Sequence, residues 1–447
     1  MTYRNLRTLT LVVGALILLG CFLFWLQQDE APLDYSRLTV EIGPEDPEVN
    51  GYTRIRQFSE TFEPVGFDDF DFYDQPAGPP DAEQLSKMQE LIEANAALLD
   101  AFGDAFQQDL FLADQPARPE TPLHEISRIR YYVRLRIFEA HIAQAEGDQE
   151  AAMTILLRSG NDAHRYAMAQ GPLISLLMSC AFAGIIENEL FELLAVGTIQ
   201  KETLTSAASS YTLPEVWPSA IRAAFQQEFW FAAYCVDLIQ ENPEEIPALL
   251  EHTGQSPRLA RTFFKPNRTK NTIFRAYAEI AEQADQPQSK QNHSFGSSLV
   301  NRMEREGFGR WLSRNLVGDL LIAILLPSTE KVLERVVERQ TGGQALRLAF
   351  ALKAYHQETG ELPDDLDTLM PQYIDAIPLD PYDRQPMRYS KDRAIIYSVG
   401  NDFIDHGGSR LPFAFTLDRD DCDKNVAERD PAGPTFALRF ATPWKSE

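Results

Sequence analysis

The sequence of 447 residues is poor in cysteine and in basic side chains. Its four cysteines form no C-x-x-C pair and no spacing typical of a metal site. Lysine and arginine number 41 against 66 acidic residues, which gives a net charge of −25. Because a nucleic-acid-binding surface needs clustered positive charge, this deficit argues against nucleic acid as a partner and favours cations.

Motifs of the common enzyme classes are also missing. The sequence has no G-x-S-x-G, no phosphate loop and no dinucleotide fingerprint. Ser328-x-x-Lys331 follows a proline and is explained more simply as a helix N-cap, and His124-Glu125 lacks the second histidine of a zinc-protease helix. We therefore expect a protein that is not an enzyme. The alternative is an exported hydrolase whose carboxylates converge from separate helices, which linear sequence cannot reveal.

Formal charge is absent from one long segment near the N-terminus. Thr8–Gln28 is mostly apolar and uncharged over 21 residues, which matches the roughly 20 residues that a transmembrane helix needs. Arg4 and Arg7 precede this segment, and Asp29 and Glu30 follow it. The positive-inside rule then keeps the short N-terminus in the cytoplasm. We expect a single-pass inner-membrane protein with the bulk of the chain outside the cytoplasm.

Two other interpretations of this segment stay open. Leu18-Leu19-Gly20-Cys21 resembles a bacterial lipobox, in which Cys21 would carry a lipid anchor, although apolar residues continue beyond it. Ordinary cleaved secretion is less favoured because no small-x-small cleavage site follows the apolar run. All three interpretations export most of the chain. In an oxidising compartment Cys180 and Cys235 could pair, but both lie in apolar, helix-like runs, so we expect buried free thiols.

Composition divides the rest of the chain into three parts. Residues 29–81 carry 14 acids, three arginines and seven prolines, and we expect an acidic, proline-rich spacer there. Residues 82–340 are dominated by helical periodicity and predict an irregular helical array. Within it, Ile126–Ala145 and the alanine-rich helix that Asp148 would cap resemble one tetratricopeptide-type hairpin. Further helices are predicted at Leu173–Val196, Pro218–Gln240 and Asn271–Ala284.

Residues 341–447 predict a small α+β module. A helix is expected through Ala345–Tyr355, and it ends near Gly360. Met387–Tyr389 and Ala394–Ser398 are expected to form two short strands joined by a polar turn, with the helix packed over them. The expected fold class is therefore mainly α: a transmembrane helix within residues 1–28, a helical array, and a terminal α+β module.

The motifs of this module occur in the order typical of a known family. Because of these motifs, residues 341–410 resemble the C-terminal region of the major pseudopilin of type II secretion systems. This resemblance implies a link to a secretion system of that type. Residues 1–28 lack the leader of that family, so we expect a borrowed module rather than a filament subunit. The whole chain also resembles membrane-anchored, helix-rich proteins of planctomycetes and related bacteria, and this second resemblance implies no activity. The motifs are AFALKAY at 349–355, GELP at 360–363, PLDPY at 378–382, MRY at 387–389 and YSVGND at 397–402.

Acidic side chains gather near the C-terminal end, and they suggest a calcium site. Ca²⁺ takes about six to eight oxygen ligands, often from flexible acidic loops. The pseudopilin resemblance implies calcium binding in the corresponding loop, and Asp402 is the first position that it carries over. A solvated acidic loop without a metal is the alternative. The candidate ligands are Asp402 and Asp405, beside a glycine-rich turn, and Asp418, Asp420, Asp421 and Asp423.

These expectations combine into one function. The sequence predicts a non-catalytic, membrane-anchored scaffold or interaction protein whose partners are other cell-envelope proteins. A shallow groove on the helical array would favour this role. A deep pocket that holds several acids and a histidine would favour the exported hydrolase.

Overall fold

The computed structural model describes residues 28–67, 80–211, 216–246, 264–284, 315–326, 329–408 and 434–439, together with positions 24, 261 and 286. Within these residues the protein is mainly helical with few strands, which confirms the expected fold class at this level. The α-helices are α2 (Gly51–Thr61), α3 (Ala82–Ala94), α4 (Ala96–Ala105), α5 (His124–Ala145), α6 (Gln149–Ala167), α7 (Leu173–Val196), α8 (Lys201–Ser210), α9 (Val216–Glu241), α12 (Pro266–Gln283), α14 (Leu316–Leu325) and α15 (Thr329–Thr359). Short 3-10 helices are η1 (Tyr35–Leu38), η3 (Pro243–Glu245) and η6 (Leu366–Leu369), and the strands are β1 (Arg388–Ser390), β2 (Ile395–Tyr397) and β3 (Thr435–Ala437).

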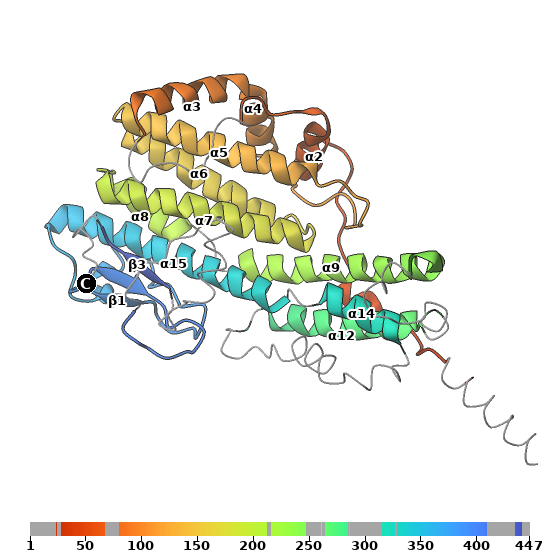
Figure 1. The fold of residues 1–447 in the computed structure, drawn as a ribbon. Coiled ribbons are helices and arrows are strands. Elements are labelled where there is room, and N and C mark those ends of the chain that lie inside the picture. The colour runs from red at the N-terminus through yellow and green to blue at the C-terminus, as the bar shows by residue number, and fades with distance from the viewer. Residues whose placement is uncertain are drawn as a thin grey trace, which may run out of the picture.

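Two large hydrophobic cores hold the described helices together. The larger core lies among α2 to α8, the second half of α15 and the strands, and it includes Ile129 and Phe350. The second core lies among η1, α9, α12, α14 and the first half of α15, and it includes Phe225 and Val336. Figure 1 shows α15 running from the α12 and α14 end of the molecule to the sheet at the other end. The helix α15 therefore joins both cores, and α7 does so as well, because Leu173, Leu176 and Cys180 near its start belong to the second core.

The helix pair α5 and α6 forms as the sequence predicts. The side chain of Asp148 accepts a hydrogen bond from the backbone N–H of Ala151 at 2.9 Å and so caps α6. Gly147 supplies the left-handed turn before it, with φ +85°. On α5, Ile129, Val133 and Ile137 are buried, which is the apolar stripe expected from their spacing.

The predicted helix at Leu173–Val196 is confirmed as α7, the central helix of the larger core. Among the described residues it is the helix long and apolar enough to cross a membrane, but 67% of its most apolar window is buried inside the protein, as in a core helix. The anchor expected at residues 8–28 lies outside the described residues, apart from positions 24 and 28. Cys180 on α7 and Cys235 on α9 are both free thiols, and Cys180 is buried as predicted, whereas Cys235 is only half-buried.

The prediction of an extended spacer over residues 29–81 is wrong for its described part. Residues 51–61 form α2, and Tyr52 and Ile55 of this helix are buried in the larger core. Asn50 caps the helix by accepting a hydrogen bond from the backbone N–H of Tyr52. The acidic composition of the segment suggested a spacer, but a few buried side chains are enough to pack a short amphipathic helix against α4 and α5.

The chain immediately after residue 28 is also fixed on the body. The carboxylate of Asp29 accepts hydrogen bonds from the backbone N–H groups of Asn267 and Arg268, at 2.8 and 3.0 Å, in the first turn of α12. These donors have no partner within the helix, and the helix dipole favours a negative charge there. Tyr35 then packs its ring between Phe229 and Phe274 at centroid distances of 5.1 and 5.2 Å. We call residues 29–38, fixed in this way, the N-terminal clamp.

The C-terminal strands pack on α15. The strands β1 and β2 pair antiparallel through the predicted polar turn, and β3 joins β2 on its other side, giving the order β1-β2-β3. The sequence analysis missed β3. The predicted border between residues 340 and 341 falls inside α15, because this helix continues without a break from Thr329 to Thr359.

Candidate functional site

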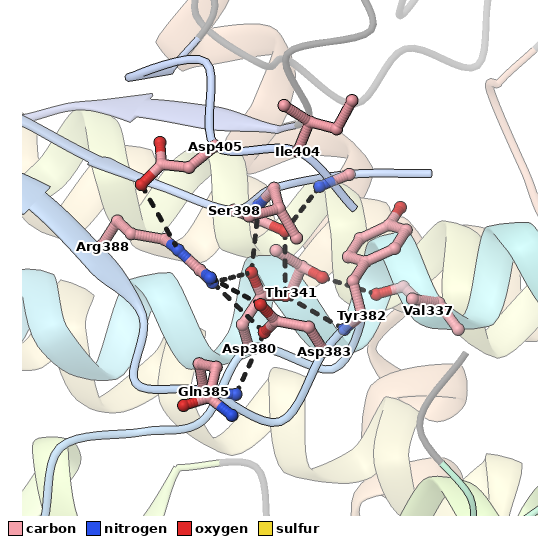
Figure 2. A network of polar contacts seen from close by, with 12 residues as sticks. Val337, Thr341, Asp380, Tyr382, Asp383, Gln385, Arg388, Ser398, Ile404 and Asp405 are labelled. Carbon is pink, nitrogen blue, oxygen red and sulfur yellow. Dashed lines mark hydrogen bonds and ion pairs between the residues drawn. The ribbon is translucent and has the colours of Figure 1, made fainter. Parts of the chain in front are cut away.

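The turn that begins with Pro378 holds a buried carboxylate at the centre of a polar network (Figure 2). Oδ1 of Asp380 accepts hydrogen bonds from the Tyr382 backbone N–H at 3.0 Å and from the Ser398 hydroxyl at 2.9 Å. Oδ2 accepts from the Val399 backbone N–H at 3.1 Å. Burial raises the pKa of Asp380, while these donors oppose the shift. The carboxylate thus ties the turn to the end of β2.

Arg388 on β1 completes this network. Its Nη1 lies 2.7 Å from Oδ2 of Asp380, and its Nη2 lies 2.5 Å from Oδ2 of Asp383. Its Nε lies 4.0 Å from Oδ2 of Asp405 (Figure 2). One guanidinium therefore faces three carboxylates, which makes the network a structural support for the turn, since charge-assisted pairs of this geometry are strong.

The structure places two of the predicted calcium ligands in one turn after β2. The carboxylate of Asp402 accepts from the Ile404 backbone N–H at 3.0 Å, and its other oxygen lies 2.7 Å from Nε2 of His406. The hydrogen bond with His406 holds the pKa of Asp402 below its usual value. Asp405 accepts from the Gly407 backbone N–H at 2.8 Å and also faces Arg388.

The neighbouring charges make Asp402 a better calcium ligand than Asp405. A cation beside Asp405 would lie close to the positive charge of Arg388, so Asp402 is the better ligand of the two. Among the described residues, no three side chains of His, Cys, Asp or Glu gather into a group that could hold a metal. The other candidates, Asp418, Asp420, Asp421 and Asp423, lie outside the described residues. Calcium binding thus stays a proposal that depends on Asp402.

A second polar site lies at the start of α5, and sequence reasoning missed it. A cavity of about 290 Å³ opens between α2, the segment before α5 and the first turn of α5. Glu125 lines it and is only 1% exposed. The signal was present in the sequence, because Glu125 precedes Ile129 by four residues and so falls on the apolar stripe of α5. A carboxylate on such a stripe is buried when the helix packs. The cavity is also lined by Arg56, Glu60, Glu120 and His124.

Compared with protein-family models, with curated proteins and with solved structures, the chain matches none of them.

Proposed function

We propose that the protein is a non-catalytic scaffold of the cell envelope, anchored in the inner membrane by residues 8–28, with other envelope proteins as partners. The observation that supports this proposal most is the N-terminal clamp. The chain that follows the proposed anchor is fixed on the body from residue 29 onward, so no long spacer separates the body from its proposed anchor.

Several contacts of the clamp join parts of the chain that are more than 190 residues apart. The side chain of Asn271 on α12 accepts hydrogen bonds from the Leu33 backbone N–H at 3.0 Å and from the Tyr35 hydroxyl at 2.8 Å. The indole N–H of Trp230 on α9 donates to the carbonyl of Leu38 at 2.6 Å. A segment bound by both side-chain and backbone groups in this way resists local opening. Such a body would be held close to the membrane by the proposed anchor, which suits a scaffold.

The positions of the N-terminal clamp and the sheet, at opposite ends of the molecule, support the same role. In Figure 1 the N-terminal clamp lies at the α12 and α14 end, and the three-stranded sheet lies at the opposite end, joined to it by α15. The module with pseudopilin-like motifs is thus presented away from the anchored end. We propose that this module contacts components of a type II secretion-like system, a proposal that rests on the sequence resemblance of residues 341–410.

Fractionation of cells tests the anchor. Full-length protein should stay with membranes through carbonate extraction, and a variant that lacks residues 1–28 should be soluble. Protease added to intact spheroplasts should digest the body of the full-length protein. Membrane association of the truncated variant, or a protected body, would contradict the proposal. Incorporation of labelled fatty acid separates the two kinds of anchor, because only a lipoprotein takes up the label, and Cys21→Ser should abolish that uptake.

The exported hydrolase stays as the second candidate because of the cavity at α5. Three glutamates and His124 line this cavity, which is the convergence expected of a carboxylate site. However, no hydrogen bond in the described residues joins the His124 ring to a carboxylate, and His124 is exposed. The scaffold is therefore favoured. Turnover of ester, peptide or glycoside substrates that Glu125→Gln abolishes would reverse this preference.

A further inference from the structure

Positive charge is concentrated in one stretch of this acidic chain. The 27 residues between Glu251 and Glu279 contain no acid, although the 66 acids in 447 residues would place about four there on average. The same stretch holds six basic residues. Its described part includes most of α12, the helix to which the N-terminal clamp is bound. The basic residues are Arg258, Arg261, Lys265, Arg268, Lys270 and Arg275.

Three of these side chains are exposed to solvent. They are Arg261, Arg268 and Arg275. Lys265 is buried, and Lys270 forms an ion pair at 2.8 Å with a carboxylate on α9. Arg268 and Arg275 are seven positions apart, which is about two helical turns, so they lie on the same side of α12. We call these two residues the basic face of α12.

The basic face lies where the chain leaves the N-terminal clamp towards the proposed anchor. The carboxylate of Asp29 accepts a hydrogen bond from the backbone N–H of Arg268 at 3.0 Å. Oε2 of Glu30 lies 3.9 Å from Nη2 of Arg275, and both side chains are about half exposed. Residues 29 and 30 directly follow residue 28, the end of the segment that is proposed to span the membrane. The basic face is therefore close to the point at which that segment would leave the bilayer.

The acids beside the basic face do not cancel its charge. Asp29 is compensated by the N-terminal dipole of α12, through two backbone hydrogen bonds. Glu30 faces Arg275 at 3.9 Å and also accepts a hydrogen bond from the amide of Asn271 at 3.2 Å. In the part of the chain that the structure describes, no ion pair involves the guanidinium of Arg268. The face therefore keeps positive charge to offer to a partner.

Simple lengths place this face at the level of the lipid headgroups. A helix of 21 residues rises about 32 Å, which crosses the roughly 30 Å of hydrocarbon and ends at its edge. The headgroup layer beyond that edge is about 5–7 Å thick. Residues 29 and 30 would thus lie in this layer, together with the turns of α12 that they contact.

We propose that the basic face of α12 binds the headgroups of anionic phospholipids, with Arg268 and Arg275 donating to lipid phosphate groups. A planar guanidinium matches a phosphate through two parallel hydrogen bonds and keeps its charge at physiological pH. A body with a net charge of −25 is repelled by an anionic surface unless it turns a basic face towards that surface. This inference rests on the membrane anchor of the proposed function and adds the kind of lipid that the body contacts.

Native mass spectrometry of the full-length protein, released from detergent micelles with added lipid, tests the proposal. Phosphatidylglycerol is the probe, and phosphatidylcholine, whose headgroup has a phosphate but no net charge, is the comparison. We expect the wild type to bind phosphatidylglycerol at least fivefold more tightly. The double variant Arg268→Gln with Arg275→Gln should bind it at least tenfold more weakly, since each basic residue near an anionic surface is worth about fivefold in affinity.

Two further double variants separate charge from structure. Arg268→Lys with Arg275→Lys keeps both charges, so it should bind phosphatidylglycerol within about threefold of the wild type, and a loss caused by a disturbed fold would not be rescued in this way. Arg384→Gln with Arg393→Gln removes two exposed arginines at the sheet end of the molecule. This control should bind like the wild type.

Equal binding of the two lipids by the wild type would overturn the proposal, and so would phosphatidylglycerol binding that the double glutamine variant of the basic face retains. Tighter binding of a polyglutamate peptide than of phosphatidylglycerol would overturn it in favour of an acidic protein partner. Carbonate extraction shows whether the anchor fails instead, because carbonate removes proteins held by charge alone and leaves spanning helices in the membrane. Full-length protein that resists carbonate, but whose lipid binding ignores the basic face, would contradict the lipid contact alone.

Discussion

The guanidinium of Arg339 on α15 lies 2.7 Å from the carboxylate of Glu187 on α7, and both side chains are only 2% exposed. Burial raises the pKa of Glu187 to about 7, and the charge of Arg339 opposes that rise. Gly342 makes room for the pair, because a Cβ there would overlap Nη2 of Arg339 and lie 2.6 Å from Oε2 of Glu187. The pair joins the central helix of the larger core to the helix that reaches the sheet.

Breaking this buried pair from one side should be costly. Arg339→Met leaves Glu187 buried without its counter-charge, and we expect a loss of about 3–5 kcal/mol in the free energy of unfolding, measured by urea denaturation. The double variant Arg339→Met with Glu187→Leu should recover much of that loss. Glu192→Gln, which breaks the exposed pair with Arg439, is the control and should cost less than about 1 kcal/mol. A small effect of Arg339→Met would contradict the assignment of a buried charge pair.

Glu125 should make stability depend on pH. Its pKa is about 7 in the folded protein and about 4.5 in the unfolded chain. The folded state therefore binds more protons between these values, so the contribution of Glu125 to stability is present below pH 4.5 and is lost as the pH rises through 7. We expect the wild type to lose up to about 3 kcal/mol relative to Glu125→Gln between pH 4.5 and 8. Parallel stability curves of the two proteins, measured by urea denaturation across this range, would show that Glu125 titrates normally.

Calcium should raise the melting temperature of the full-length protein if Asp402 is a ligand. The ion must displace His406 from the Asp402 carboxylate, since Nε2 of His406 lies 2.7 Å from one of its oxygens. Asp402→Ala should abolish the shift. Asp392→Ala is the control, because Asp392 is exposed in the turn between β1 and β2 and should leave the shift intact. No shift of the wild-type melting temperature in millimolar calcium would exclude the site.

Removal of the Asp29 carboxylate should loosen the N-terminal clamp. Asp29→Ala deprives the first turn of α12 of its acceptor, a loss worth about 1 kcal/mol, so trypsin should cleave after the exposed Arg37 about fivefold faster in the membrane-bound protein. Release of the body into solution measures the cleavage. The Glu41→Gln variant, at an exposed position just beyond the clamp, should be cleaved at the wild-type rate. Equal rates for Asp29→Ala and wild type would mean that the clamp does not depend on this carboxylate.

The local part of the fold could be predicted because its signals lie within a few residues of one another. The bounds of α7 follow from an apolar run between Pro172 and Gly197. The start of α6 could be predicted because Asp148, directly after Gly147, is a typical N-cap residue. The strands β1 and β2 are separated by a single polar turn, so their pairing could also be predicted. Each of these elements is determined by its own sequence.

The features that were missed depend on partners far away in the chain. Strand β3 is short and is defined by pairing with β2, across a long intervening segment. Tyr52 reaches Glu125 across 73 positions, and Asn271 reaches Leu33 across 238. The spacer predicted for residues 29–81 rested on average composition. Composition over a window does not show which few side chains will be buried in a core. The candidate site at α5 was missed for the same reason.

The N-terminal clamp determines how far the body can move away from the proposed anchor. A flexible spacer over residues 29–81 would let the body sample a volume about 40 Å across, and it could capture partners at many heights above the bilayer. With Asp29 bound to α12, residues 29–38 no longer lengthen the connection between the proposed anchor and the body, so that volume is much smaller. If the anchor proposed for residues 8–28 holds, the sheet end of α15 meets its partners within a narrow range of heights above the bilayer.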